Sequence, residues 1–207
     1  MNIYLVRHGE SEGNASGTTQ TSEMSLSKKG RIQAKALAKR LKNIKIDIIY
    51  SSHIQRAKET AEIISKEIIK PIESWKDLQE MRTSKEREGL TWENKENQRI
   101  MKLINTNYYR GNWKYSDEET FEELRDRCQN ILNHLLDKHE NEEVLCISHG
   151  GVIRMVTAIA IFGDILTPQM FLKFWHHTWH ENTGITKIGY TEKYGIVLLT
   201  WNDTTHL

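Results

Sequence analysis

The sequence predicts an α/β fold: a three-layer α/β/α sandwich with a mainly parallel sheet and a strand hairpin near the C-terminus. Three observations favour this fold. Short apolar runs occur at residues 3–6, 47–52 and 143–148, and such runs are typical of strands buried on both faces. Stretches with helical apolar spacing separate these runs. Strands that alternate with helices need a sheet covered by helices on both sides.

The first predicted helix follows the strand at residues 3–6. Ser27 can cap its free amide groups, and its apolar positions recur at three- and four-residue intervals. These positions are Ala34, Leu37, Ala38 and Leu41. The same spacing predicts a second helix over residues 53–68, after the strand at 47–52. Pro71 then precedes a short predicted strand at residues 71–75.

The second half of the chain predicts further elements of the same kinds. Six apolar positions define a third long helix: Phe121, Leu124, Cys128, Ile131, Leu132 and Leu135. The strand at 143–148 leads into an apolar helix at about residues 151–162. The segments GITKIGY and GIVLLTW flank the turn-like TEKYG and predict a hairpin. Residues 76–116 are polar and weakly periodic, and we interpret them as a small helical and loop excursion over the active site.

Length and charge limit the classes of function. A chain of 207 residues fits one domain, which we assign to residues 1–207, with 76–116 as a cap-like excursion within it. The formal net charge of +1 favours neither nucleic acid nor a membrane surface as a partner. We see no leader peptide or membrane span, so we expect a cytoplasmic protein. Cys128 and Cys146 lie in a predicted helix and strand, where we expect them to be core residues.

A basic segment covers residues 28–45, which contain many lysines and arginines and no acidic residue. We interpret this segment as the solvated face of a helix. The alternative is a docking surface for an anionic partner, which would require the charges to form a patch.

Polar side chains follow three predicted strands at their carboxyl ends. Arg7 and His8 follow the first strand, Arg56 begins the helix after the second, and His149 and Gly150 follow the strand at 143–148. Ligands of parallel α/β sheets bind at this edge. Guanidinium groups form paired hydrogen bonds with phosphate oxygens, and the N-termini of the following helices offer free amide groups. The arrangement therefore predicts a site for a phosphate dianion.

His8 can act as a nucleophile at such a site. A neutral imidazole attacks phosphorus through one ring nitrogen when the other donates its proton to a fixed acceptor. The competing interpretation is a metal site, because His176, His177 and His180 lie close together in FWHHTWHENTG. That stretch lacks a carboxylate or thiolate at ligand spacing, so we predict no metal and no other cofactor.

The motifs of this chain resemble those of the histidine phosphatase superfamily, the phosphoglycerate mutase-like group of branch 1. The resemblance rests on RHGES with Asn14, SSHIQRAKETA, DLQE, EETFEELRDR and VLCISHGGVIR, and it runs along nearly the whole chain. It implies that His8 is the nucleophile and that Glu80 donates a proton to the leaving oxygen. Other carboxylates that compete for the acid role are Glu10, Glu86 and Glu88.

The resemblance also implies a set of residues that hold the phosphoryl group. These are Arg7, Ser11, Asn14, Arg56, His149 and Gly150, of which His149 completes the phosphate pocket. The implied activity is metal-independent hydrolysis of a small phosphorylated metabolite through a phosphohistidine. The segment MRTSKEREGLTWEN departs from the YGxLQGLNK-like segment of the mutases, which disfavours the alternative of a phosphomutase. A non-catalytic binding protein on the same fold is the second alternative.

Three tryptophans lie in or beside the polar excursion: Trp75, Trp92 and Trp113. They can form an aromatic rim for a ring-containing substrate. Equally, they can anchor the excursion to the core, because tryptophan is usually largely buried.

Overall fold

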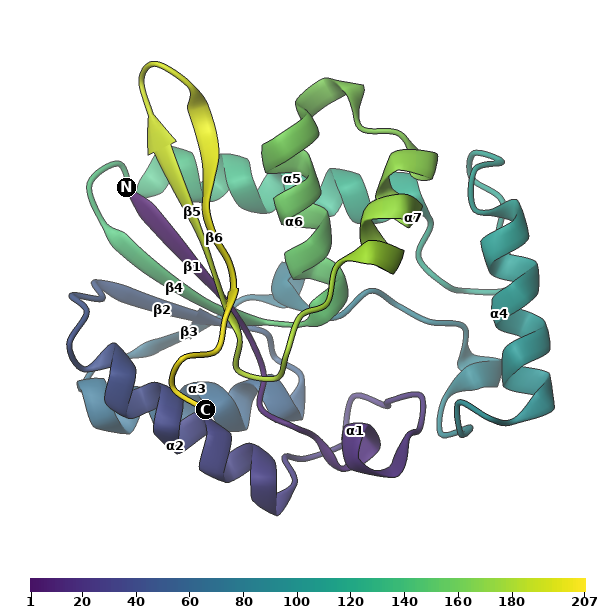
Figure 1. Cartoon of the computed structure of the whole chain (residues 1–207), viewed down its shortest axis with the longest axis horizontal. Helices are drawn as coiled ribbons and strands as arrows, with labels where there is room; N and C mark the ends of the chain where they lie inside the picture. The colour runs from purple at the N-terminus through teal and green to yellow at the C-terminus, as the bar shows by residue number, and fades with distance from the viewer.

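A six-stranded sheet forms the centre of the molecule in a computed structural model that describes all residues 1–207 (Figure 1). The strand order is β3-β2-β4-β1-β5-β6. The strands are β1 (Asn2–Arg7), β2 (Ile48–Ser51), β3 (Ile72–Ser74), β4 (Glu143–Ser148), β5 (Ile185–Thr191) and β6 (Gly195–Asp203). Strands β1 to β4 are parallel, whereas β5 and β6 form the predicted antiparallel hairpin at one edge.

The register of the central strands brings the predicted site residues to one edge of the sheet. Strand β1 pairs with β4, and Arg7 lies opposite Ser148. The residues that follow, His8 and His149, are therefore neighbours. Strand β2 lies on the other side of β4 and ends at the same edge, so the helix after β2 also begins there.

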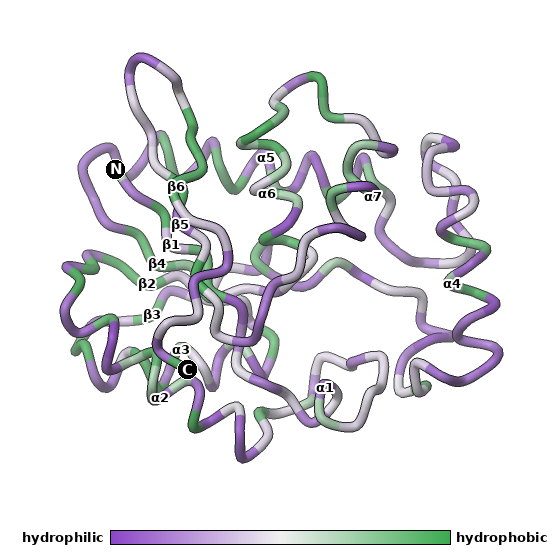
Figure 2. Tube along the Cα trace, in the orientation of Figure 1, coloured by the Kyte–Doolittle hydropathy of each residue, from purple (hydrophilic) through white to green (hydrophobic).

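Helices cover both faces of the sheet, which confirms the predicted three-layer sandwich. Helices α2 (Lys28–Leu41) and α3 (Gln55–Ile68) cover one face. Helices α5 (Phe121–Lys138), α6 (Gly150–Phe162) and α7 (Pro168–His177) cover the other. The strands alternate accordingly: Tyr4 and Val6 pack beneath α2 and α3, while Ile3 and Leu5 face α5 and α6. Figure 2 shows the apolar residues along the central strands and α6, and a hydrophilic tip on the β5–β6 hairpin.

The basic segment forms most of α2, and its charges are distributed among acidic neighbours. Lys29 Nζ lies 3.1 Å from a carboxylate oxygen of Glu10, and Arg31 Nη2 lies 2.8 Å from one of Glu59. Arg40 pairs with Asp203 at the end of β6. Exposed pairs of this kind contribute about 0–1 kcal/mol each. They fit the solvated face predicted from the sequence. Cys128 and Cys146 are buried and free, as expected of core residues.

The excursion at residues 76–116 contains two 3₁₀ turns, η1 (Lys76–Leu78) and η2 (Lys85–Arg87), and helix α4 (Lys95–Asn107). It is tied to the loop after the short helix α1 (Glu12–Ser16). The amide of Thr19 donates to the carbonyl of Leu90, and the amide of Gly89 donates to the carbonyl of Thr19, both at 2.9 Å. The excursion is thus joined to the chain segment that follows His8.

Two helices, α4 within the predicted helical and loop excursion and α7, had no bounds in the sequence prediction. Helix α4 has only three buried residues, two of which are asparagines, so it leaves little apolar periodicity in the sequence. Helix α7 begins with Thr167 as its N-cap and Pro168 in its first turn, a pair that is a helix start signal in the sequence. No helix of the chain is both long and apolar enough to cross a membrane.

Candidate active site

His8 lies just beyond the end of β1, in a loop that packs tightly on α2. Its amide donates to the carbonyl of Ser148 at 3.0 Å, and its side chain is 1% exposed. A Cβ atom on Gly9 would lie 2.6 Å from the carbonyl oxygen of Gly30, and one on Gly30 would lie 2.0 Å from that of Glu10. Only glycine at both positions allows the two backbones to approach this closely.

The hydrogen bonds of His8 define which ring nitrogen carries the proton. Nδ1 lies 2.7 Å from the carbonyl oxygen of Gly9, and Nε2 lies 3.2 Å from Nε of Arg56. A carbonyl only accepts and a guanidinium only donates, so Nδ1 is protonated and Nε2 carries the lone pair. Burial lowers the pKa of His8 well below its usual value, and the cations Arg56 and Arg7 lower it further. His8 is therefore neutral, as a nucleophile must be.

Two guanidinium groups act on His8, that of buried Arg56 and that of partly buried Arg7. Arg56 begins α3, and its Nη1 donates to the carbonyl of Thr21 at 2.8 Å. Arg7 donates through Nη1 to the carbonyl of His180, whereas its buried Nε has no partner. Burial lowers the pKa of Arg7 and lowers that of Arg56 to about 10; nearby Glu80 opposes both shifts. Two cations held in a desolvated site favour an anionic ligand.

His149 is the N-cap residue of α6, and its ring lies 5.0 Å from that of His8 between centroids. Its Nε2 lies 2.9 Å from Oγ of Ser52, and the same hydroxyl oxygen accepts from the amide of Ile54. The hydroxyl of Ser52 can donate its proton to Nε2, and in that tautomer the ring proton of His149 lies on Nδ1. That buried Nδ1 has no partner in the chain. Burial, followed by the charge of Arg56, lowers the pKa of His149 well below its usual value.

Glu80 joins the excursion to the start of α6. Its Oε1 accepts from the amides of Met81 at 2.8 Å and Gly151 at 3.0 Å. A Cβ atom on Gly151 would lie 2.5 Å from this oxygen, so glycine is required for the contact. Gly150 precedes it at the first turn of α6, where helix amides lack partners within the helix. Oε2 of Glu80 makes no hydrogen bond and is free to act on a ligand.

The competing carboxylates have other partners or are exposed. Glu10 accepts from Ser27 Oγ at 2.7 Å and pairs with Lys29 on α2. Glu86 accepts from Ser116 Oγ at 2.8 Å, and Glu88 is exposed. Among the four candidates, Glu80 is the one whose charge acts on the pKa of both active-site arginines.

Ser11 and Asn14 form a capping box at α1. The amide of Asn14 donates to Ser11 Oγ at 3.0 Å, and the amide of Ser11 donates to Asn14 Oδ1 at 3.3 Å. Asn182 Nδ2 donates both to Asn14 Oδ1 and to the carbonyl of His8, at 3.2 and 3.0 Å. Both residues therefore shape the loop that carries His8, and their contact with phosphate remains a prediction.

Several residues that support the site were not found in the sequence. Thr60 Oγ1 accepts from the amide of Gly9 at 3.1 Å and donates to the carbonyl of Arg56 at 2.7 Å. The amide of Thr183 donates to the carbonyl of Arg7 at 3.0 Å. His206 Nε2 lies 3.0 Å from Oγ1 of Thr183 and thereby links the C-terminal residues to the same loop.

A buried ion pair holds the segment around Glu80. Arg127 on α5 donates from Nε to Glu119 Oε1 at 2.8 Å and from Nη2 to Glu119 Oε2 at 2.7 Å. Both side chains are largely buried. Nη1 of Arg127 also donates to the carbonyls of Asp77 and Gln79. Glu119 Oε2 accepts from the amide of Arg82 at 3.2 Å. The pair therefore fixes the backbone on both sides of Glu80.

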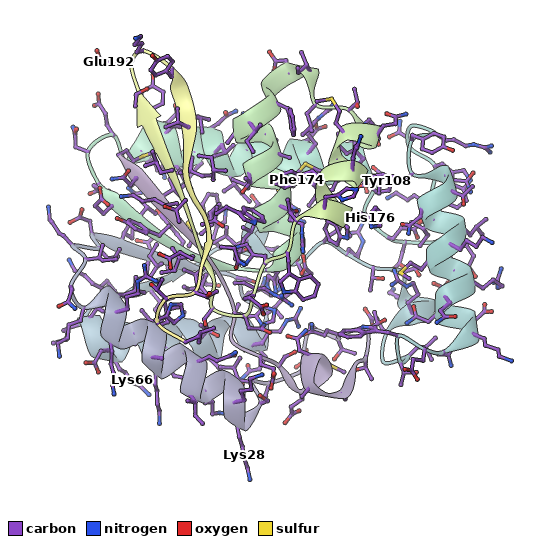
Figure 3. All side chains as sticks on the ribbon, in the orientation of Figure 1. Lys28, Lys66, Tyr108, Phe174, His176 and Glu192 are labelled. Carbon is purple, nitrogen blue, oxygen red and sulfur yellow. The ribbon has the colours of Figure 1, made fainter.

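A cavity of about 690 Å³ opens above these residues. Arg56 and Glu80 are among its lining residues, whereas His8 and His149 are buried and do not line it. The loop at 18–22, the excursion and α7 supply its walls. Figure 3 labels Tyr108 and His176, which line this cavity beside α7. Trp92 lines it as well, with 54% of its surface exposed, whereas Trp75 packs against Tyr50 in the core as an anchor.

The three histidines near α7 do not converge. His180 is buried, its Nε2 lies 2.9 Å from Thr186 Oγ1, and burial lowers its pKa to about 3. His176 and His177 lie at the end of α7, and His176 lines the cavity. His180 therefore supports the fold, and its carbonyl holds Arg7.

The sequence matches known proteins along nearly its whole length. Residues 3–204 match the family model of the histidine phosphatase superfamily (branch 1). Phosphoglycerate mutase-like protein 4 of Arabidopsis thaliana is 36% identical over 91% of this chain and 90% of its own. The metal-independent phosphoserine phosphatase of the same plant is 29% identical over 92% of this chain and 86% of its own.

Solved structures of the same fold include the phosphoserine phosphatase of Entamoeba histolytica. A histidine-to-alanine mutant of that enzyme in complex with phosphoserine has a TM-score of 0.81 at 28% identity, with 100% of this chain and 98% of that chain covered. A complex of the same enzyme with 3-phosphoglyceric acid also has a TM-score of 0.81. Both ligands are small phosphorylated metabolites.

Proposed function

Because the chain belongs to branch 1 of the histidine phosphatase superfamily, we propose that it hydrolyses small phosphate monoesters, without a metal, through a phosphohistidine on His8. The chain is a phosphatase by its family and by its phosphatase relatives. The observation that carries the proposed mechanism is the state of His8. Its neutral imidazole donates from Nδ1 to the carbonyl of Gly9 and carries a lone pair on Nε2, which accepts from Arg56, and the charge of Arg7 also acts on the ring.

In the first half-reaction, His8 Nε2 attacks phosphorus and the bond from phosphorus to the ester oxygen breaks. Arg56, which donates to Nε2 in the free site, turns to a phosphoryl oxygen. The unpartnered Nε of Arg7 and Nδ1 of His149 supply further donors for the charge on these oxygens. Glu80, which takes up a proton when the phosphate dianion of the substrate lies beside it, donates that proton from Oε2 to the leaving oxygen, which departs as an alcohol.

In the second half-reaction, water attacks the phosphohistidine. Glu80, now a carboxylate, takes a proton from the water, and the bond between Nε2 and phosphorus breaks. Inorganic phosphate leaves, and both His8 and Glu80 return to their starting protonation states. The same carboxyl group thus acts first as acid and then as base.

The first experiment measures phosphate release from nitrophenyl phosphate in excess chelator, with the wild type and His8→Ala purified side by side. We expect chelator-resistant release by the wild type and a loss of at least about 1,000-fold in the variant, because the nucleophile is absent. Circular dichroism of both proteins controls for folding. Turnover by a folded His8→Ala protein at the wild-type rate would refute the role of His8, and loss of wild-type activity in chelator would refute metal independence.

O-phosphoserine and 3-phosphoglycerate are suitable first substrates, because the phosphoserine phosphatase of similar structure binds them. The mutase-like name of one relative also justifies a test for phosphoryl transfer within 3-phosphoglycerate. We expect hydrolysis to inorganic phosphate to exceed formation of 2-phosphoglycerate. If nuclear magnetic resonance showed more 2-phosphoglycerate than inorganic phosphate, the result would favour a phosphomutase instead.

A further inference from the structure

His206, which follows strand β6, contacts the loop that holds the backbone of the proposed nucleophile, although it does not line the cavity. We infer that His206 is a positioning residue for the proposed phosphoryl transfer. Acting through Thr183, it fixes the carbonyl groups on either side of the His8 Cα atom and so sets the line along which Nε2 approaches phosphorus. This inference rests on the proposed function.

Thr183 has a backbone conformation that threonine rarely adopts. Its φ is 61°, in the left-handed region, and the residue is fully buried. This region is disfavoured for a side chain branched at Cβ, so the surrounding contacts have to hold the residue there. The conformation turns the amide of Thr183 towards the active-site loop, where it donates to the carbonyls of Arg7 at 3.0 Å and His8 at 3.3 Å.

A chain of hydrogen bonds with one direction holds Thr183 in place. Its hydroxyl donates to the carbonyl of Asn182 at 2.6 Å, so the hydroxyl oxygen accepts from His206 Nε2, which lies 3.0 Å away. The ring of His206 therefore carries a proton on Nε2. Its Nδ1 faces Nη1 of Arg40 at 3.4 Å, a group that only donates, so Nδ1 carries the lone pair.

The ring of His206 is itself held by helix α2, beside which Figure 1 shows the end of the chain. Arg40 of this helix donates to both carboxylate oxygens of Asp203. Burial lowers the pKa of His206 and the charge of Arg40 lowers it further, whereas Asp203 opposes the shift. The ring is therefore neutral, as the chain of hydrogen bonds requires. Helix α2 thus supports the loop of His8 in two places, through Gly30 and through Arg40.

The contact acts on the nucleophile more than on the groups that would hold phosphate. The guanidinium of Arg7 is fixed independently, because its Nη1 donates to the carbonyl of His180. The other proposed donors to the phosphoryl group lie on α3 and at the start of α6. Loss of the His206 contact should therefore leave an anion bound but displace His8 Nε2. A displacement of about 1 Å costs up to about 100-fold in rate.

The test uses two inhibitors of nitrophenyl phosphate hydrolysis. Orthovanadate forms a five-coordinate adduct with a nucleophile and therefore needs His8 Nε2 in its position of attack, whereas inorganic phosphate needs only the groups that bind the anion. The measured quantities are kcat and the inhibition constant for phosphate divided by that for vanadate. This ratio does not depend on the amount of folded enzyme, so a variant that folds poorly still gives a result.

We expect His206→Ala to lower both kcat and the ratio by about 10- to 100-fold, because the nucleophile is displaced while phosphate still binds. His206→Gln should restore part of both, since its amide can donate to Thr183 Oγ1. Thr183→Val removes the hydroxyl but keeps the branched shape, and it should match His206→Ala. The double variant should lose no more than either single variant, because both remove the same contact.

Leu207→Ala is the matched control, because Leu207 adjoins His206 in the chain and its side chain is exposed. This variant should keep the wild-type kcat and ratio. A wild-type ratio in His206→Ala would overturn the inference. So would an equal loss of affinity for both inhibitors, which would mean that the whole anion site had moved, or additive losses in the double variant.

Failure of the proposed function would give a different result, because the wild type would then not hydrolyse nitrophenyl phosphate. Calorimetric titration with phosphate and with vanadate would still give the ratio for the wild type and His206→Ala. An unchanged ratio in that titration would overturn the role of His206 as well.

Discussion

At the scale of single residues, the geometry of Glu80 separates its two carboxylate oxygens by role. Oε1 accepts from two backbone amides, and Oε2 is free to exchange a proton with the substrate. The general acid matters most when the leaving group is a poor one, because an alkoxide must be protonated as it departs, whereas nitrophenolate leaves unaided.

Glu80→Gln keeps the shape and one acceptor oxygen but removes the proton. We expect kcat for an alkyl phosphate to fall by about 100- to 10,000-fold, and kcat for nitrophenyl phosphate to fall much less. Steady-state kinetics with both esters measure the difference. Glu86→Gln is the matched control on the same excursion. If kcat for the two esters fell to the same extent in Glu80→Gln, the proton donor would have to be another group.

The sequence could predict that the residues of the proposed phosphate pocket lie together, because each lies at or directly after a strand end. His8, Arg7 and His149 lie within one residue of β1 or β4, so the parallel order of the sheet brings them together. Thr60, Asn182 and Thr183 could not be predicted, since their role depends on contacts with residues far away in the sequence. A threonine or asparagine in a loop or helix carries no local signal of such a contact.

At the scale of elements, helix α5 does more than cover the sheet. Through Arg127 and Glu119 it holds the segment between η1 and η2, which carries Glu80, the proposed general acid. The position of Glu80 relative to His8 therefore depends on the packing of α5. Arg127 is a positioning residue, because it touches the backbone beside Glu80 and not the substrate.

Arg127→Met should reproduce part of the Glu80→Gln kinetics. It leaves the Glu119 carboxylate buried without its partner, so we expect a loss of about 3–5 kcal/mol in the free energy of unfolding. If Arg127 had a merely structural role, its replacement would reduce the amount of folded enzyme and would lower the measured activity towards both esters equally. We expect the alkyl ester to lose more kcat than nitrophenyl phosphate per folded molecule, with concentrations taken from active-site titration. Equal losses would argue against positioning.

Helices α4 and α7 show where prediction of elements from the sequence fails. The α2, α3 and α5 helices were predicted because each buries a complete apolar stripe. Helix α4 instead faces the cavity and buries mainly asparagine side chains, one of which orients Arg87. Helix α7 fully buries only Phe171, so it also lacks a complete apolar stripe. Elements that line a cavity lack the periodicity that packing against a sheet imposes.

At the scale of the whole molecule, the buried histidines make stability depend on pH. Burial is the main cause that lowers the pKa of His8, His149 and His180, in the last case to about 3. The unfolded chain then binds more protons than the folded one below the ordinary histidine pKa of about 6.5. Stability is therefore complete above this pH and is lost as the pH falls below it.

We expect the free energy of unfolding in urea to decrease between pH 7.5 and pH 5.5. Each of these histidines contributes up to about 1.4 kcal/mol per pH unit below 6.5. His180→Gln removes one of the three and should make the decrease shallower, although the variant starts from a lower stability. Asp203, whose pKa is lowered chiefly by Arg40, acts in the same direction only at much lower pH. Equal stability at the two pH values would show that these histidines are protonated in the folded protein.

The close approach of Gly9 and Gly30 has a consequence for how the chain tolerates change. The backbone of the first turn of α2 packs directly against the loop that carries His8. It leaves no space for a methyl group on either Gly9 or Gly30. In a library of random single variants selected for activity, position 30 should accept as few replacements as position 8. An alanine there, on a helix that contributes no side chain to the proposed chemistry, would then be scored as though it had removed the proposed nucleophile itself.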